Sequence, residues 1–168
     1  MNIIIRNESE SDVETISVIT KAAFENLPIS NHTEQFIIDA LRNANALTIS
    51  LVAEMEKKVV GHIAFSPVTI SNGSPDWYGL GPISVLPELQ KQGIGKSLMR
   101  EGLSLLRSLG AKGCVLVGGP GYYERFGFKS LPDLFVDGVP PQYVLALPIE
   151  EREAHGTAVF HEAFSANG

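Results

Sequence analysis

The feature that most constrains the fold lies between residues 77 and 118, where two apolar segments enclose a glycine-containing loop and an amphipathic helix. The segments WYGLGPISVL and CVLVGG are typical of strands, and the second has the composition of a buried strand. Apolar residues at helical spacing follow the loop PELQKQGIG and stop before Gly110. A strand, a helix and a strand in this order form a right-handed crossover between parallel strands. The chain therefore needs a sheet that is at least partly parallel.

The segments before this unit predict two helices and an antiparallel hairpin. Residues 2–6 predict a short strand, and the capping-box spacing of Ser11 and Glu14 predicts a first helix that ends near Asn26. A second helix is expected after Asn31. The β-rich runs ALTISLVAEM and VVGHIAFSPVTI flank the charged turn EKK, which favours a hairpin.

The segments after the unit predict a short helix and further strands. GYYERFG has the character of a short helix, FKSL of the start of a strand, and residues 142–149 and 156–164 of late strands. The whole order is β-α-α-β-β-β-α-β-α-β-β. This order places the chain in the α/β class, with a mixed sheet flanked by helices.

Length and charge exclude several classes of protein. The 168 residues fit a single domain spanning 1–168, and 44% apolar residues suffice for a sizeable core. The net charge of −6 and the lack of a Lys/Arg-rich run speak against a nucleic-acid or anionic-membrane surface. Cys114, in the apolar run CVLV, is interpreted as a buried structural thiol. No signal peptide or membrane-spanning run is visible, so a cytoplasmic location is expected.

The loop QKQGIGKS at residues 90–97 fits one of three phosphate-binding patterns. An ATP-type loop requires glycine where Gln90 stands, and that glycine lets the backbone curl around a phosphate. A dinucleotide loop requires glycine where Leu98 stands, at a point of close helix–strand packing. The pattern [QR]-x-x-G-x-[GA] fits residues 90–95 without a mismatch. Glycines at a helix N-terminus let backbone N–H groups approach an anion closely.

This third pattern resembles the acetyl-CoA loop of the GCN5-related N-acetyltransferases. A second motif of that family, Y-x-x-x-G-F, matches Tyr123 to Phe128 about thirty residues downstream. The form YYERFGF is particularly similar to the YhbS-like group of predicted acetyltransferases. The resemblance covers residues 80–128 and implies the acyl-CoA N-acyltransferase fold, a mostly antiparallel central sheet flanked by helices.

The resemblance also implies roles for individual residues. Backbone groups of the strand before the loop would bind pantetheine and polarise the acetyl carbonyl, and the loop would bind the pyrophosphate of acetyl-CoA. Tyr123 would protonate the departing thiolate as a general acid. The implied strand residues are Ile83, Ser84 and Val85, and the implied loop residues are Gln90, Lys91, Gln92, Gly93, Ile94, Gly95 and Lys96. Two alternatives stay open: Tyr123 is a core aromatic with Tyr122 facing the substrate, and Lys96 lies on a solvated helix face.

The implied reaction is attack of a primary amine on the acetyl thioester, with no metal. The amine must lose a proton, and the motifs do not identify the base among Asp76, Glu54, Glu56, His62 and water. The acceptor is a small-molecule or peptide amine, with a pocket expected from residues 12–45 and 129–168, in a monomer or homodimer. The alternatives are an acyl-CoA-sensing module without catalysis and a P-loop kinase or NTPase.

Overall fold

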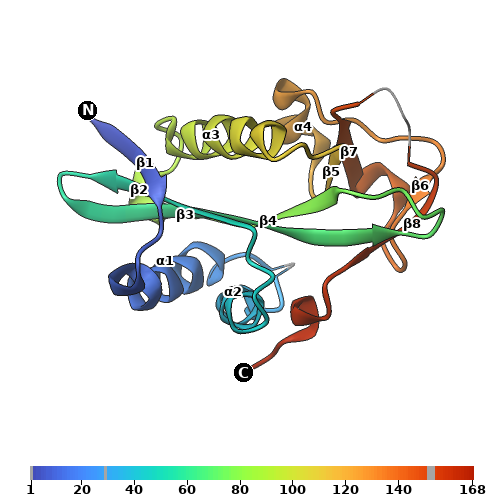
Figure 1. The fold of residues 1–168 in the computed structure, drawn as a ribbon. Helices are drawn as coiled ribbons and strands as arrows, with labels where there is room; N and C mark the ends of the chain where they lie inside the picture. The colour runs from blue at the N-terminus through green and yellow to red at the C-terminus, as the bar shows by residue number, and fades with distance from the viewer. Residues whose placement is uncertain (1, 29, 151–153) are drawn as a thin grey trace.

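The computed structural model describes residues 2–28, 30–150 and 154–168. A single twisted sheet divides the molecule into two layers (Figure 1). Helices α1 (Val13–Phe24) and α2 (Glu34–Asn43) cover one face, and α3 (Ile94–Ser108) covers the other. The short helix α4 (Pro120–Tyr123) follows β5 on the side of α3. None of the helices in these residues combines the length and apolarity that crossing a bilayer requires.

The sheet is mostly antiparallel. Its main path runs β1-β2-β3-β4-β5-β7, in which β4 and β5 pair in parallel, and off this path the short strand β6 pairs in parallel with β8. The long strand β3 shares one edge between two partners, because β2 pairs with its first half and β8 with its last three residues. The strands of the described residues are β1 (Ile3–Asn7), β2 (Ile49–Met55), β3 (Lys58–Ile70), β4 (Trp77–Val85), β5 (Gly113–Val117), β6 (Leu134–Phe135), β7 (Val144–Pro148) and β8 (Gly156–Phe160).

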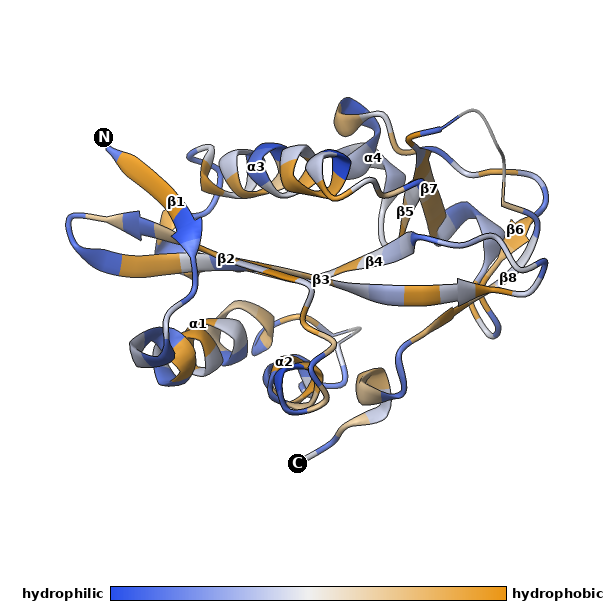
Figure 2. Ribbon diagram, viewed as in Figure 1, coloured by the Kyte–Doolittle hydropathy of each residue, from blue (hydrophilic) through white to orange (hydrophobic). Residues whose placement is uncertain are grey.

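The main core lies between the sheet and α3. Buried residues of β2, β3 and β5 pack there against Leu98, Met99 and Leu106 of α3, and Figure 2 shows the apolar side of this helix turned to the strands. Gly102 permits this close approach, since a Cβ at this position would lie 2.4 Å from the Phe65 ring. A smaller cluster of Ile16, Ile38 and Val52 holds α1 and α2 on the opposite face.

The predicted elements are largely present, with three corrections. The capping box involves Ser9 and Asp12, whose carboxylate accepts from Ser9 N at 2.7 Å, and not Ser11 and Glu14; a 3₁₀ turn, Glu10–Asp12, precedes α1. The expected strand at FKSL is wrong, because its pairing is limited to one bridge between Lys129 and Ala146. The last strand ends at Phe160, where His161 Nδ1 accepts from Ala163 N and caps a 3₁₀ turn, Glu162–Ser165.

Candidate active site

The site begins where β4 and β5 separate. The parallel pairing joins only Trp77–Gly79 to Gly113–Val115, although β4 continues to Val85. A bulge lies at this point, since Phe65 of β3 pairs with Leu80 but Ile63 pairs with Ile83, so β4 contains one extra residue. The second half of β4 therefore keeps β3 on one edge and diverges from β5 on the other.

Backbone groups of this divergent half point in alternating directions. Leu86 N donates to Val60 O at 3.0 Å, and antiparallel pairing alternates along the strand. It follows that the backbone N–H and C=O of Ser84 face β3, whereas those of Ile83 and Val85 face the open edge toward β5. Of the three predicted strand residues, Ile83 and Val85 are thus placed to bind an extended ligand through their backbone. Ser84 turns its hydroxyl to the other face, 3.3 Å from Thr20 Oγ1.

The predicted loop connects this open edge to the N-terminus of α3. A 3₁₀ turn, Pro87–Leu89, leads into it, and Gln90 Nε2 donates to Val85 O at 3.1 Å, which ties the loop to the end of β4. Lys91 and Gly93 both have positive φ, 65° and 90°, and α3 has no acidic residue in its first turn. Such a turn directs successive N–H groups outward and forms an anion-binding concavity.

Some side chains of the loop are buried in the core and others are exposed to solvent. Ile94 is 1% exposed within the core, so only its backbone is available to a ligand. Gly95 lies under Tyr122, whose hydroxyl would lie 2.9 Å from a Cβ at this position. The side chains of Gln90, Lys91, Gln92 and Lys96 are exposed.

The two tyrosines of α4 occupy different environments. Tyr123 packs on the main core, at 6.2 Å between ring centroids from Phe128, and Gly118 makes room for its ring, since a Cβ there would lie 2.7 Å away. Burial, together with neighbouring Tyr122, raises the pKa of Tyr123 to about 12. Tyr122 is exposed and lies beneath the Arg125 guanidinium, 5.0 Å from its ring centroid. Tyr123 is therefore a neutral phenol at pH 7, largely shielded from water.

Comparisons with known proteins agree with this geometry. The sequence model of the Acetyltransferase (GNAT) family matches residues 14–128. The chain belongs to the GNAT acetyltransferase family. This confirms the resemblance seen in the two motifs and establishes the chain as an acyltransferase.

Individual GNAT proteins resemble the chain over most of its length. It is 34% identical over 127 residues to the uncharacterized N-acetyltransferase YhbS of Escherichia coli K12, covering 75% of this chain and 73% of that protein. A GNAT acetyltransferase from Brucella melitensis, solved in complex with acetyl-CoA, is 48% identical with a TM-score of 0.87, covering 97% and 98% of the two chains. The E. coli YhbS structure in complex with CoA has a TM-score of 0.90 at 28% identity, covering 100% and 94%. The mostly antiparallel GNAT fold is thereby confirmed.

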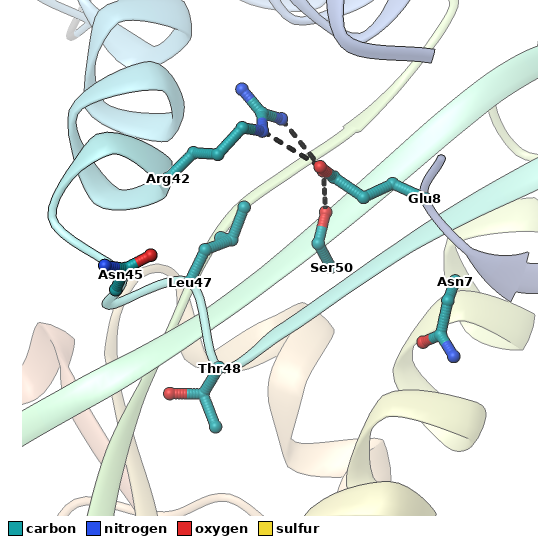
Figure 3. Close-up of a pocket in the computed structure, with 7 residues that line it drawn as sticks. All are labelled: Asn7, Glu8, Arg42, Asn45, Leu47, Thr48 and Ser50. Carbon is teal, nitrogen blue, oxygen red and sulfur yellow. Dashed lines mark hydrogen bonds and ion pairs between the residues drawn. The ribbon is translucent and has the colours of Figure 1, made fainter. Parts of the chain in front are cut away.

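The opposite face of this GNAT sheet carries a polar cluster that the sequence did not reveal. Glu8, just after β1, accepts from Arg42 Nε at 2.9 Å and Nη2 at 2.8 Å, and also from the Ser50 hydroxyl (Figure 3). Burial disfavours ionisation of Glu8, but the hydrogen bonds from Arg42 and Ser50 outweigh it and lower the pKa of the carboxyl. These residues line a surface pocket with Asn7, Asn45, Leu47 and Thr48.

His62 extends this cluster into the sheet. It is fully buried, and its Nε2 lies 2.8 Å from Ser50 Oγ. The Ser50 hydroxyl uses its proton to donate to Glu8, so the Ser50 oxygen accepts from Nε2–H of His62. This hydrogen bond places the proton of neutral His62 on Nε2 and leaves a lone pair on Nδ1. Burial lowers the pKa of His62 to about 4, with the charge of Glu8 raising it and that of Arg42 lowering it further. Among the described residues, Nδ1 has no hydrogen-bond partner.

The other predicted bases lie in different surroundings. Glu54 is tied to Arg6 at 3.4 Å, beside the ion pair between Arg6 and Asp12. Glu56 occupies the exposed hairpin turn, and exposed Asp76 precedes β4. His62, in contrast, pairs in register with Ser84, next to Ile83 and Val85. Cys114 is buried in β5 and burial raises the pKa of its thiol, as a structural role requires.

Proposed function

We propose that this chain transfers the acetyl group of acetyl-CoA to a primary amine by direct attack. One observation carries the proposal: the open edge of β4 leads through a short 3₁₀ turn into the anion-binding turn at α3, and Tyr123 is the last residue of α4, the helix that follows β5. An extended thioester with a pyrophosphate at one end requires this order of groups. The complexes of the Brucella relative with acetyl-CoA and of YhbS with CoA support the same choice of ligand.

The chain's own residues would hold the cofactor mainly through backbone groups. The N–H groups of residues 91–96 would bind the pyrophosphate, aided by the dipole of α3. Ile83 N–H and Val85 N–H would bind along the pantetheine arm, and one of them would polarise the acetyl carbonyl as an oxyanion-hole donor does. When bound, acetyl-CoA supplies an activated thioester carbonyl.

Tyr123 would act as the general acid. A pKa of about 12 keeps the phenol protonated over the whole physiological range, so the proton donor is always loaded. The same shift makes Tyr123 a weaker acid than an ordinary thiol, whose pKa is about 8.5, so the phenol would act mainly by donating a hydrogen bond to the charge that develops on the departing sulfur. Packing against Gly118 and Phe128 fixes the ring, so the direction of transfer is set by the core.

Among the candidate bases, His62 has the best-defined proton-accepting atom, Nδ1. Its Nδ1 lone pair is fixed by the hydrogen bonds from His62 to Ser50 and from Ser50 to Glu8. A pKa of about 4 is too low for taking a proton from a free ammonium ion, whose pKa is about 10. The attacking species would therefore be the free amine, formed when the ammonium ion loses a proton to water. Once its nitrogen has bonded to the carbonyl carbon, a remaining N–H proton is far more acidic, and His62 would accept that proton through a water molecule.

The acceptor would approach from the α1–α2 face, since α3 and the loop occupy the other. The acidic chain, with a net charge of −6, favours a cationic acceptor, so a small-molecule or peptide amine is proposed.

The test is a comparison of ligand binding and turnover. Acetyl-CoA, Mg-ATP and NAD are compared by thermal shift, because a ligand of the folded state raises the melting temperature by mass action. Acetyl-CoA alone should stabilise the protein, and a panel of amines should then release free CoA thiol. Stabilisation by Mg-ATP alone would reject the proposal. Binding of acetyl-CoA without thiol release from any amine would favour an acyl-CoA-sensing module instead.

A further inference from the structure

A second cavity adjoins the anion-binding turn on its outer side. It lies between the first turns of α3 and the segment of α4 with the following 3₁₀ turn, Glu124–Phe126. Its lining consists of Lys96, Arg100, Gly121, Glu124, Arg125 and Phe126. Lys96 belongs both to this cavity and to the loop, so the two anion-binding features are contiguous.

Positive charge is concentrated around this cavity. Lys96 and Arg100 are four residues apart on α3 and so share one face of the helix, and Arg125 faces them from the other wall. None of the ion pairs formed by the described residues involves these three side chains, so no carboxylate neutralises them by direct pairing. Since the chain as a whole is acidic, three unpaired cations at one cavity indicate an anionic ligand.

Two contacts join Arg125 to the loop. Its guanidinium lies over the Tyr122 ring, with the Cζ atom 5.0 Å from the ring centroid, a cation–π arrangement. The Tyr122 hydroxyl in turn reaches Gly95 in the first turn of α3. Tyr122 therefore holds Arg125 on the side of the cavity that faces the pyrophosphate-binding turn.

The charge of the cavity fits a phosphate monoester. Three cations and the one carboxylate of Glu124 leave two net positive charges, and a phosphate monoester carries about −1.5 to −2 at pH 7. Coenzyme A has such a group on the 3′ position of its ribose, close to the pyrophosphate. Arg100 lies about one helical turn, roughly 6 Å, beyond Lys96 along α3, which is the scale of the separation between the two phosphate groups.

We propose that Lys96, Arg100 and Arg125 bind the 3′-phosphate of coenzyme A and make this enzyme discriminate against the dephosphorylated form of the cofactor. This inference rests on the proposed use of acetyl-CoA. Lys96 would then contact a phosphate group and would not simply lie on a solvated helix face. Tyr122 would position Arg125.

The experiment measures affinity, not turnover. Isothermal titration compares CoA with 3′-dephospho-CoA on the wild-type protein and on Arg100→Gln, which lies outside the backbone loop. Arg107→Gln, exposed in the last turn of the same helix, is the matched control for loss of one charge. Wild type should bind dephospho-CoA on the order of tenfold more weakly than CoA. Arg100→Gln should weaken CoA binding severalfold and leave dephospho-CoA binding unchanged, and Arg107→Gln should affect neither.

Three results would overturn the inference. Equal affinity of the wild type for both ligands would show that the 3′-phosphate makes no useful contact. If Arg100→Gln lowered the affinity for CoA and for dephospho-CoA by the same factor, Arg100 would act through general electrostatic attraction and not through a contact with the 3′-phosphate. Absence of binding by either ligand would reject the proposed use of acetyl-CoA itself, so the two failures are distinguishable.

Discussion

On the α3 face the groups proposed to bind the thioester and the pyrophosphate belong to the backbone, whereas on the α1–α2 face the polar groups belong to side chains that meet across the sheet. The first set is arranged by glycines, a bulge and a helix N-terminus within residues 79–96. The second set joins Glu8, Arg42, Ser50 and His62 from four separate segments. Backbone sites tolerate changes of most side chains, while the side-chain cluster depends on each member. The predictions below test this contrast.

The largest expected effect is at Tyr123, the one side chain that the proposed chemistry needs on the α3 side. Tyr123→Phe keeps the ring and its packing but removes the proton donor. Turnover, measured as thiol release, should fall on the order of 100-fold or more, while acetyl-CoA affinity measured by titration stays within about twofold. Tyr122→Phe is the matched control and should retain turnover. Retained activity in Tyr123→Phe would contradict the general-acid role of Tyr123 and favour the alternative in which Tyr123 is a core aromatic.

The next effect concerns stability on the α1–α2 face. The pKa of His62 is about 4 in the folded protein, against an ordinary value of 6.5. Between these pH values the unfolded chain binds a proton that the folded protein does not. The stabilisation is therefore complete above pH 6.5 and is lost as the pH falls toward 4, by up to about 3 kcal/mol.

Urea unfolding as a function of pH checks this expectation. His62→Gln keeps an N–H donor for Ser50 but removes the titrating ring, so its free energy of unfolding should change less steeply between pH 6.5 and 4. The same substitution at exposed His155 should leave the slope as in the wild type. Identical slopes for all three proteins would mean that His62 titrates normally and is not enclosed as described.

A smaller effect is expected from the glycine that starts α3. Gly93 has φ of 90°, and an L-residue in this region costs about 1–2 kcal/mol. Gly93→Ala should lower the free energy of unfolding by that amount and weaken acetyl-CoA binding, because the N–H groups of the turn are redirected. Gly119→Ala is the control, since φ is −75° there and a Cβ meets no atom within 4 Å. Equal stability of the two variants would show that the turn is not constrained.

The smallest effect is expected at Gln90, although it is the first residue of the sequence motif. Its side chain donates to Val85 O, so its role is to position the loop. Gln90→Ala should cost about 1 kcal/mol or less, with a correspondingly small loss of acetyl-CoA affinity, and Gln92→Ala should cost less still. A loss of affinity above tenfold would instead show that Gln90 contacts the cofactor directly.

The contrast between the faces also explains what the sequence could predict. The strand, loop, helix and strand from 77 to 118 were predictable because each depends on local signals: alternation, glycines and helical spacing. The capping box was misplaced by two residues because the alternation of Ser and acidic residues in ESESD, residues 8–12, offers two equivalent helix starts. FKSL was predicted as a strand from its composition, but its extent depends on tertiary pairing that the sequence does not encode locally.

The side-chain cluster could not be found in the same way. Glu8 and Ser50 are 42 residues apart and Glu8 and Arg42 are 34 apart, so no spacing rule connects them. His62 was visible as a histidine in an apolar strand, but its tautomer depends on Ser50 and Glu8. The backbone groups of Ser84 and Ile83 point in opposite directions, and which of them faces the open edge could be assigned only from the pairing register of β4 with β3. Tyr122 and Arg125 were visible only as neighbours of a motif.

The bulge in β4 has a further consequence for the length of the chain. Leu80 and Ile83 both contact the core under α3, although residues three apart in a regular strand point to opposite faces. Deleting one residue at Gly81 or Pro82 would place Leu80 and Ile83 two residues apart, so both would still face α3 in an unbroken alternation, and Ser84 would still face α1. Every side chain would keep its face, and only the bulge beside the point where β4 diverges from β5 would be lost. The open edge proposed for the thioester therefore depends on one extra residue of β4, whatever side chain that residue carries.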